Sequence, residues 1–129
     1  MIDTLKVWHK LVDNSEVNGL DELLDEDVIF YSPVVHMPQK GKQKTTQYLS
    51  AAFYLFRGNH FQYVKQIIDN SSAALEFELE IDGILVNGID IIIWNDEGKI
   101  IEFKVLIRPL KAINLIHQKM AEMLERLKT

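Results

Sequence analysis

The second half of the chain alternates four apolar segments with short turns, and this pattern constrains the fold more than any other feature. The segments cover residues 61–69, 73–81, 84–94 and 100–107, and they are rich in β-branched and aromatic residues. Strands that follow one another through such short turns pair as antiparallel hairpins. The sequence therefore predicts a four-stranded meander over residues 61–107.

The dipeptide Asp82-Gly83 sets the register of the central hairpin. Asp-Gly favours a two-residue type I′ turn, which places Ile81 opposite Ile84. Counting back along both strands places Leu75 opposite Asp90, and opposed residues share one face of a sheet. The register therefore predicts that the carboxylic acid Asp90 lies on the apolar inner face.

The following turn leaves two registers open. A four-residue loop over 95–98 places Trp94 opposite Lys99 and turns four apolar side chains to the face of Asp90, namely Ile101, Phe103, Val105 and Ile107. A three-residue loop with Gly98 as a left-handed residue turns three charged side chains inward instead, namely Glu102, Lys104 and Arg108. Burying three charges without partners costs several kcal/mol, so we expect the four-residue loop.

Helical spacing of apolar residues dominates the rest of the chain. The pattern predicts helices over 2–12, 19–24, 45–56 and from Pro109 onward, a strand over 28–31 and a loop over 33–41. Asp3 is suited to cap the first helix, and proline is favoured at the first position of a helix. Helices that are separated in sequence from a long antiparallel sheet indicate the α+β class.

The outer side of the predicted sheet is also partly apolar. The register turns Ile89, Ile91, Ile93 and Leu106 to this side, with charged residues around them. An apolar patch with a charged rim is typical of a subunit interface. We therefore expect a homodimer that forms through the outer sheet face.

Composition excludes several classes of function. The 129 residues are 47% hydrophobic and 26% charged, which predicts a single globular domain over residues 1–129. The net charge of −5 and the lack of a basic block argue against nucleic acid as a partner. The longest apolar stretch, 89–94, falls far short of the roughly 20 residues that cross a membrane, and the first residues lack a secretory pattern. We therefore expect a cytoplasmic protein.

Recognisable metal and cofactor motifs are also missing from the sequence. The chain has no cysteine, so disulfides and thiolate chemistry are excluded. His9, His60 and His117 lie far apart without metal-ligand spacing, and the glycines form no phosphate-binding loop. We therefore expect neither a metal nor a cofactor.

Two side chains are candidates for chemistry. Asp90 on an apolar face must find hydrogen-bond donors or keep its proton, and a protonated carboxyl can donate to a ligand carbonyl. His36 lies in the irregular loop 32–38, where an imidazole can act as a base near neutral pH. Both also admit a structural interpretation, with Asp90 bonded to a backbone N–H or at the open mouth of the sheet, and His36 as an exposed loop residue.

The order of the elements is accompanied by three short motifs, namely Tyr31-Ser32-Pro33, Asn87-Gly88-Ile89-Asp90 and Glu97-Gly98-Lys99-Ile100-Ile101-Glu102-Phe103. With them, nearly the whole chain resembles the SnoaL-like branch of the nuclear transport factor 2-like (NTF2-like) superfamily. The resemblance implies a cone in which a curved antiparallel sheet wraps around N-terminal helices, with a further helix at the C-terminus. This fold hosts ketosteroid isomerase and limonene epoxide hydrolase, so the fold alone does not imply one chemistry.

The resemblance also places individual residues. It puts Asp90 where ketosteroid isomerase has its protonated aspartate, Trp8 near the oxyanion tyrosine and Ser32 near the general-base aspartate. Val105 takes the place of an aspartate of limonene epoxide hydrolase. Neither reaction carries over intact, because Trp8 can donate only a single N–H, Ser32 cannot act as a base unaided and Val105 has no carboxylate.

The expected pocket is an apolar cone that holds one carboxyl group. Its predicted ligand-binding residues are Trp8, Tyr31, Ser32, Phe53, Phe56, Phe77, Phe103, Val105 and Ile107. One predicted function is the binding of a small apolar ligand in this pocket without catalysis. The alternative is a cofactor-independent isomerase, cyclase or hydrolase that acts on an apolar carbonyl compound or epoxide through Asp90 and His36. Whether His36 reaches the pocket separates these two functions.

Overall fold

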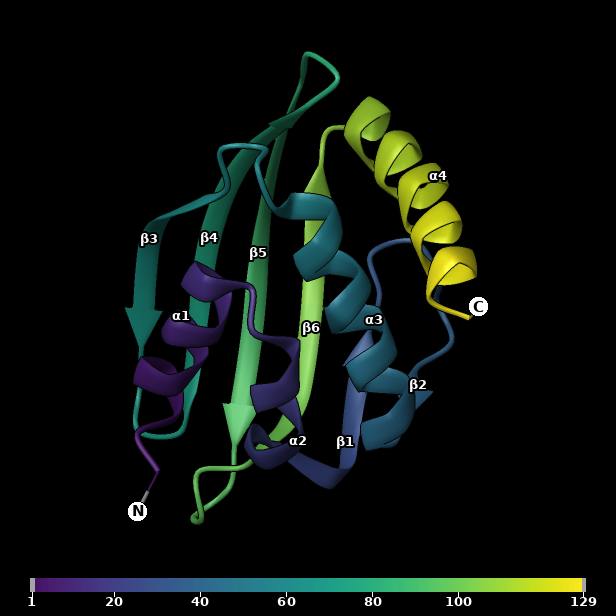
Figure 1. The fold of residues 1–129 in the computed structure, drawn as a ribbon. Helices are drawn as coiled ribbons and strands as arrows, with labels where there is room; N and C mark the ends of the chain where they lie inside the picture. Colours follow the sequence, from purple (N-terminus) through teal and green to yellow (C-terminus); the bar gives the residue numbers. More distant parts are fainter. Residues whose placement is uncertain (1, 129) are drawn as a thin grey trace.

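The structure, a computed structural model, describes residues 2–128, and in that range it contains four α-helices and a six-stranded sheet (Figure 1). In chain order the elements are α1 (Thr4–Asn14), a 3₁₀ turn (Val17–Gly19), α2 (Leu20–Leu23), β1 (Leu24–Tyr31), β2 (Gln39–Lys40), α3 (Lys42–Phe56), β3 (Gln62–Ile68), β4 (Ser72–Ile81), β5 (Ile84–Trp94), β6 (Ile100–Arg108) and α4 (Leu110–Leu127). The strand order is β2-β1-β6-β5-β4-β3. Strands β3 to β6 form the predicted antiparallel meander, and β1 adds a parallel strand beside β6, so the sheet is mixed.

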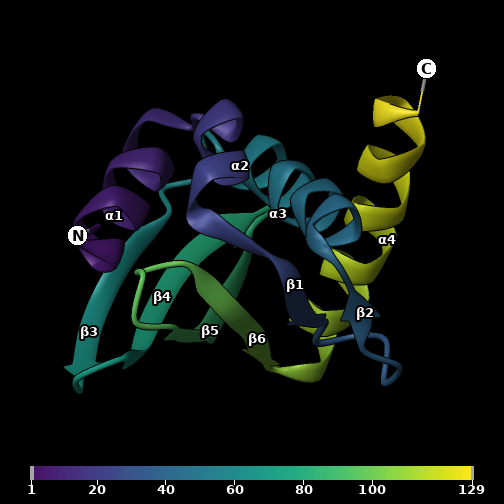
Figure 2. The same ribbon diagram turned by 90° about the horizontal axis from the view of Figure 1, so that it is seen from below.

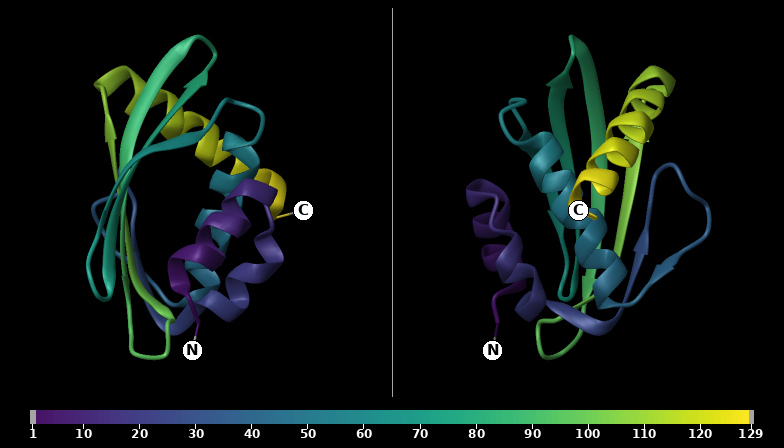
Figure 3. Two further views of the ribbon diagram at one scale, coloured as in Figure 1. Left: turned by 90° about the vertical axis from the view of Figure 1, so that its left-hand side faces the viewer. Right: turned by 45° about the vertical axis from the view of Figure 1, so that its right-hand side comes forward.

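The helices lie on one face of this curved sheet. Figures 2 and 3 show the sheet curling around α1, α2 and α3, while α4 packs against α3 and against the central strands β5 and β6. The predicted α+β cone with a C-terminal helix is therefore confirmed. No helix within residues 2–128 has the length and apolar character to span a membrane.

The first third of the chain matches the predicted elements with two differences. Asp3 caps α1, and its carboxylate accepts a hydrogen bond from the Lys6 N–H at 3.3 Å. Strand β1 begins at Leu24, earlier than predicted, because Leu24 pairs with Ile100 of β6 across an irregular register. The two-residue strand β2 lies in the segment that was predicted to be a loop, where it pairs with β1.

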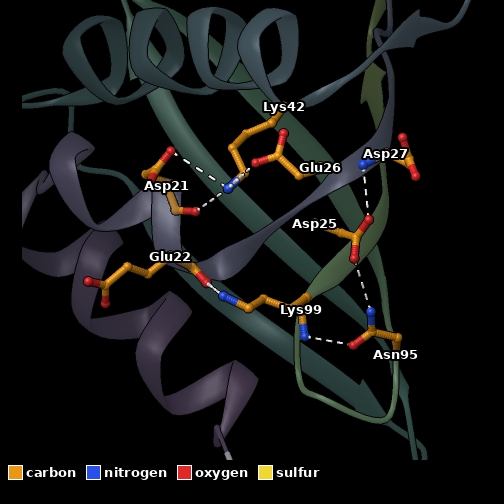
Figure 4. Close-up of polar contacts among 8 residues, drawn as sticks. All are labelled: Asp21, Glu22, Asp25, Glu26, Asp27, Lys42, Asn95 and Lys99. Carbon is orange, nitrogen blue, oxygen red and sulfur yellow. Dashed lines mark hydrogen bonds and ion pairs between the residues drawn. The ribbon is translucent and has the colours of Figure 1, made fainter.

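Polar contacts hold the acidic start of β1 in place (Figure 4). The Lys42 ammonium lies 3.6 Å from the carboxylate of Asp21 and 3.2 Å from that of Glu26. The Asn95 amide donates to the carboxylate of Asp25 at 3.2 Å. These contacts join the α2–β1 segment to α3 and to the turn between β5 and β6.

The register of the central hairpin is confirmed. Ile81 pairs with Ile84 and Leu75 pairs with Asp90. Asp82 and Gly83 have φ values of 51° and 78°, the left-handed conformation that both central residues of a type I′ turn require. Asp90 therefore lies on the inner face of the sheet, as predicted.

The second hairpin has the predicted faces but a shifted register. Asp90 pairs with Val105, and the inner face holds Phe103, Val105 and Ile107 as expected. Ile101 was predicted to point inward, and this is wrong: Ile101 is exposed, and Ile100 is fully buried in its place. A bulge beside Trp94 causes the difference, because it inserts one extra residue into β6.

Two apolar clusters fill the space between the sheet and the helices. One lies beneath α1 and α2 around Trp8, and the other lies beneath α4 around Phe77. Tyr63 and Val105 pack against both clusters, so the core is continuous. Gly88 lets the Phe77 ring cross β5, since a Cβ at this position would lie 2.4 Å from that ring.

Candidate functional site

A cavity of about 400 Å³ lies between the inner face of the sheet and the helices. Its walls come from α1, α3, α4 and the inner residues of β1, β3, β5 and β6. Aromatic rings make up much of this wall, namely those of Trp8, Phe30, Tyr48, Phe53, Phe56, Phe61, Tyr63 and Phe103. The cavity therefore offers an apolar, ring-lined volume to a ligand.

Most of the predicted pocket residues line this cavity. They are Asp90, Trp8, Ser32, Phe53, Phe56, Phe103, Val105 and Ile107. Phe77 is not among the lining residues: it is buried in the second apolar cluster, with its ring centroid 5.2 Å from that of Phe61. Tyr31 is not a lining residue either, because its ring faces Lys104 of β6, whose ammonium lies 4.9 Å from the ring centroid.

His36 lies apart from the other predicted site residues. It is exposed in the loop between β1 and β2 and is not one of the residues that line the cavity. The preceding residues Ser32, Pro33 and Val34 do line it. The structure therefore brings Asp90 to the cavity and leaves His36 on the outside of the loop.

Asp90 is the centre of a hydrogen-bonded chain of three side chains. It lies on β5 between Leu75 and Val105 and is only 7% exposed. The Tyr63 hydroxyl donates to Asp90 Oδ2 at 2.6 Å, and the indole N–H of Trp8 donates to the Tyr63 oxygen at 3.0 Å. The Trp8 N–H is therefore engaged by Tyr63 and does not point a donor at a ligand.

Burial raises the pKa of both titratable side chains in this hydrogen-bonded series, Asp90 and Tyr63. Loss of solvation raises the pKa of Asp90 from 3.8 to about 7, although the hydrogen bond from Tyr63 opposes the rise. Burial and the nearby negative charge of Asp90 raise the pKa of Tyr63 well above its ordinary value of 10.0. Tyr63 therefore keeps its proton at neutral pH, whereas Asp90 changes charge close to it.

The direction of these hydrogen bonds sets where a proton on Asp90 must lie. Oδ2 accepts from Tyr63, so the protonated carboxyl carries its hydrogen on Oδ1. Oδ1 has no donor or acceptor among residues 2–128, and Asp90 lines the cavity. The neutral acid can therefore donate to an oxygen atom of a ligand, and the carboxylate can accept a proton or a hydrogen bond.

Tyr63 was absent from the residues predicted from sequence, and a β-bulge explains why. From Ile68 to Lys65 the β3–β4 ladder is regular, and continuing it would turn Tyr63 to the outer face. The register shifts between Lys65 and Tyr63, so that Tyr63 pairs with Phe77 and points inward. Bulges commonly re-aim side chains beside functional sites, but the sequence of β3 carries no signal for this one.

Several exposed or half-buried polar residues also line the cavity. The last turn of α1 and the residue that ends it contribute Asp13 and Ser15, and the segment from α3 into β3 contributes Arg57, His60 and Gln62. Among residues 2–128 there is no group of three or more His, Asp or Glu side chains placed to hold a metal ion. The lining thus combines a polar rim with an apolar interior around Asp90.

Comparison with known proteins places the chain in a family. Residues 6–103 match the sequence profile of the SnoaL-like domain. No curated protein sequence matches the chain significantly. Among solved structures, a steroid delta-isomerase from Pseudomonas aeruginosa is 31% identical with a TM-score of 0.91, covering 96% of this chain and 90% of that one.

Two further structures support the same fold. A protein from Silicibacter pomeroyi with a cystatin-like fold is 25% identical, with a TM-score of 0.86 over 95% of this chain and 85% of its own. An NTF2-like protein of unknown function from Mesorhizobium loti is 20% identical, with a TM-score of 0.72 over 82% and 91% of the two chains. The chain therefore belongs to the SnoaL-like domain family and has the NTF2-like fold.

Proposed function

We propose that this protein binds a small, mostly apolar ligand with an oxygen acceptor that faces Asp90. The observation that carries the proposal is the hydrogen-bonded chain from Trp8 through Tyr63 to Asp90, which leaves one carboxyl oxygen open to an aromatic cavity. Ketones, lactones and epoxides have the matching chemistry, because each combines an apolar body with an oxygen acceptor.

The dimensions and chemistry of the cavity support this ligand class. Its volume of about 400 Å³ lies in the range of small-molecule sites, about 300–1,000 Å³. Asp90 is the one charged residue in the described chain that is buried, and burial there favours the neutral, donating form of the acid.

A thermal-shift screen tests the binding proposal. Apolar ketones, lactones and epoxides are added to the wild type, to Asp90→Ala and to the matched control Glu78→Ala, which removes an exposed carboxylate from the same sheet. A ligand that binds only the folded state raises the melting temperature. We expect compounds that stabilise the wild type and Glu78→Ala but not Asp90→Ala. Compounds that stabilise all three proteins equally would contradict the role of Asp90.

The second candidate function is a cofactor-independent isomerase, cyclase or hydrolase that uses Asp90 as its acid. A pKa of about 7 suits proton transfer at neutral pH, and the structural neighbour from Pseudomonas aeruginosa is named a steroid delta-isomerase. His36 would need the loop after β1 to fold inward before it could act as the base. Asp90 needs no such movement.

Product analysis separates catalysis from binding. Each compound that passes the thermal-shift screen is incubated with the wild type, Asp90→Asn and His36→Ala, and the recovered material is analysed by mass spectrometry and NMR. For an enzyme we expect conversion by the wild type and none by Asp90→Asn. If every sample contains only unchanged compound, the enzymatic function is excluded and the binding function stands.

We also propose that two copies of the chain associate through the outer sheet face. Ile89, Ile91 and Ile93 are half-buried there, and Leu106 is 50% exposed. We expect Ile91→Glu to give a monomer in light scattering, while the control Leu127→Glu, at the exposed end of α4, keeps the wild-type mass. An unchanged mass for Ile91→Glu would exclude this interface.

A further inference from the structure

The turn between α3 and β3 places two nitrogen-bearing side chains on the rim of the cavity. Arg57 ends α3, and His60 follows it in a left-handed conformation with φ of 59°. Asn59 fixes the turn on both sides, because its amide donates to the Leu55 carbonyl at 2.7 Å and its own carbonyl accepts from the Glu80 N–H at 3.1 Å. The positions of Arg57 and His60 are therefore built into the turn.

Arg57 is a positioned cation without a carboxylate partner in the described chain. Its guanidinium carbon lies 5.0 Å from the ring centroid of Tyr54, its neighbour on α3, and Arg57 is one of the residues that line the cavity. No carboxylate of residues 2–128 forms an ion pair with it, whereas Lys42 has two such partners and Lys119 has one. A guanidinium presents paired N–H donors that match a carboxylate, and this match is retained at an exposed rim.

Asp13 adds a negative charge to the rim, on a different element from Arg57. It lines the same cavity from the last turn of α1, and its carboxylate does not pair with Arg57. A negative group on a ligand is repelled at the α1 side and attracted at the α3–β3 side. His60 and Gln62 can add hydrogen bonds on that second side.

We propose that the ligand carries a carboxylate at its outer end, received by Arg57 and His60, while its apolar body fills the cavity. This inference rests on the proposed binding function for the body of the ligand and extends it to a class, namely apolar keto acids. The oxygen acceptor faces Asp90 inside, and the anion stays at the solvent-exposed rim, where its desolvation cost is small.

Two matched probes test the carboxylate. The first is para-acetylbiphenyl, and the second is the same ketone with a carboxylate at the para position of the far ring. Dissociation constants are measured by calorimetry for the wild type, Arg57→Gln, Asp13→Asn and the control Lys44→Gln, which removes an exposed charge from α3 away from the lining. The quantity compared is the ratio of the two dissociation constants within each protein.

We expect the carboxylate to strengthen binding to the wild type by about tenfold, as for a charge-assisted hydrogen bond at a partly exposed site. Arg57→Gln should abolish this advantage, and a wild-type circular dichroism spectrum checks that the variant is folded. Asp13→Asn should increase the advantage several-fold, and Lys44→Gln should not change it.

Other outcomes overturn the inference and separate it from the proposed function. If the plain ketone binds through Asp90 and the carboxylate adds nothing, the inference fails and the binding function stands. If Lys44→Gln reduces the advantage as much as Arg57→Gln, the effect is a general charge effect and the assignment to Arg57 fails. If neither probe binds to the wild type, both proposals fail for aryl ketones.

Discussion

Replacing Asp90 by Asn should make the protein more stable at alkaline pH. In the wild type the carboxyl group is buried beside apolar residues and has a pKa of about 7, compared with 3.8 for a solvated aspartate. Asn keeps a carbonyl oxygen that accepts from Tyr63 and keeps an N–H that faces the cavity, but it never becomes charged. The substitution thus removes the ionisation and retains the hydrogen bond.

The magnitude follows from the linkage between proton binding and folding. Below about pH 4 the carboxyl is protonated in the folded and the unfolded chain, so its burial carries no ionisation cost. Between pH 4 and 7 the unfolded chain releases the proton while the folded chain retains it, so the free energy of unfolding falls as pH rises. At about 1.4 kcal/mol for each pH unit, the loss reaches about 4 kcal/mol above pH 7. This is a large share of the about 5–15 kcal/mol that stabilises a typical domain.

Urea unfolding of both proteins at a series of pH values checks this reasoning. The difference in free energy of unfolding, Asp90→Asn minus wild type, should rise by about 4 kcal/mol between about pH 4 and pH 8 and then level off. Titratable groups that do not interact with Asp90 cancel in this difference, and Tyr63 keeps its proton over this pH range. A difference that stays constant with pH would show that Asp90 has an ordinary pKa in the folded protein, and the argument from burial would be refuted.

Three further substitutions test separate parts of the structure. Tyr63→Phe removes the hydrogen bond that opposes the rise in the pKa of Asp90, so the midpoint of the pH dependence should move above about 7, as followed by the same urea series. Gly88→Ala should cost about 2 kcal/mol or more in thermal unfolding, because its Cβ would lie 2.4 Å from the Phe77 ring; wild-type stability would contradict the close approach. Thr45→Val should stabilise the protein by about 1 kcal/mol in urea, since the buried Thr45 hydroxyl has no hydrogen-bond partner among residues 2–128; a loss of stability would contradict this.

The parts of the fold that the sequence predicts are those with local signals. Asp82-Gly83 specified its turn type, so the central hairpin could be counted residue by residue and Asp90 could be placed on the inner face. The turn between β5 and β6 depends on the Asn95 side chain, whose carboxamide oxygen accepts from the N–H groups of Glu97 and Lys99. Loop length alone does not reveal these bonds, and the prediction for Ile101 failed for that reason.

Within the candidate site, the sequence could place only a side chain whose position follows from a single regular strand pairing. Asp90 followed from a single hairpin register, whereas its partner Tyr63 depends on a bulge in β3 that moves it from the outer face to the inner face. The position of His36 depends on the irregular loop between β1 and β2, for which the sequence supplies no periodicity. Arg57 and His60 are indistinguishable in sequence from ordinary surface residues.

The parallel pairing of β1 with β6 imposes an order on folding. The meander from β3 to β6 consists of neighbours in sequence, so it can form early and without the rest of the chain. Leu24 and Phe30 find their partners Ile100 and Phe103 only after the whole meander has been synthesised. We expect the inner face of the sheet, with Asp90, to stay open to water until that pairing forms, so that the cavity closes late in folding. A late step of folding should therefore bury the Trp8 indole, and in a Trp94→Phe background its fluorescence would report that step.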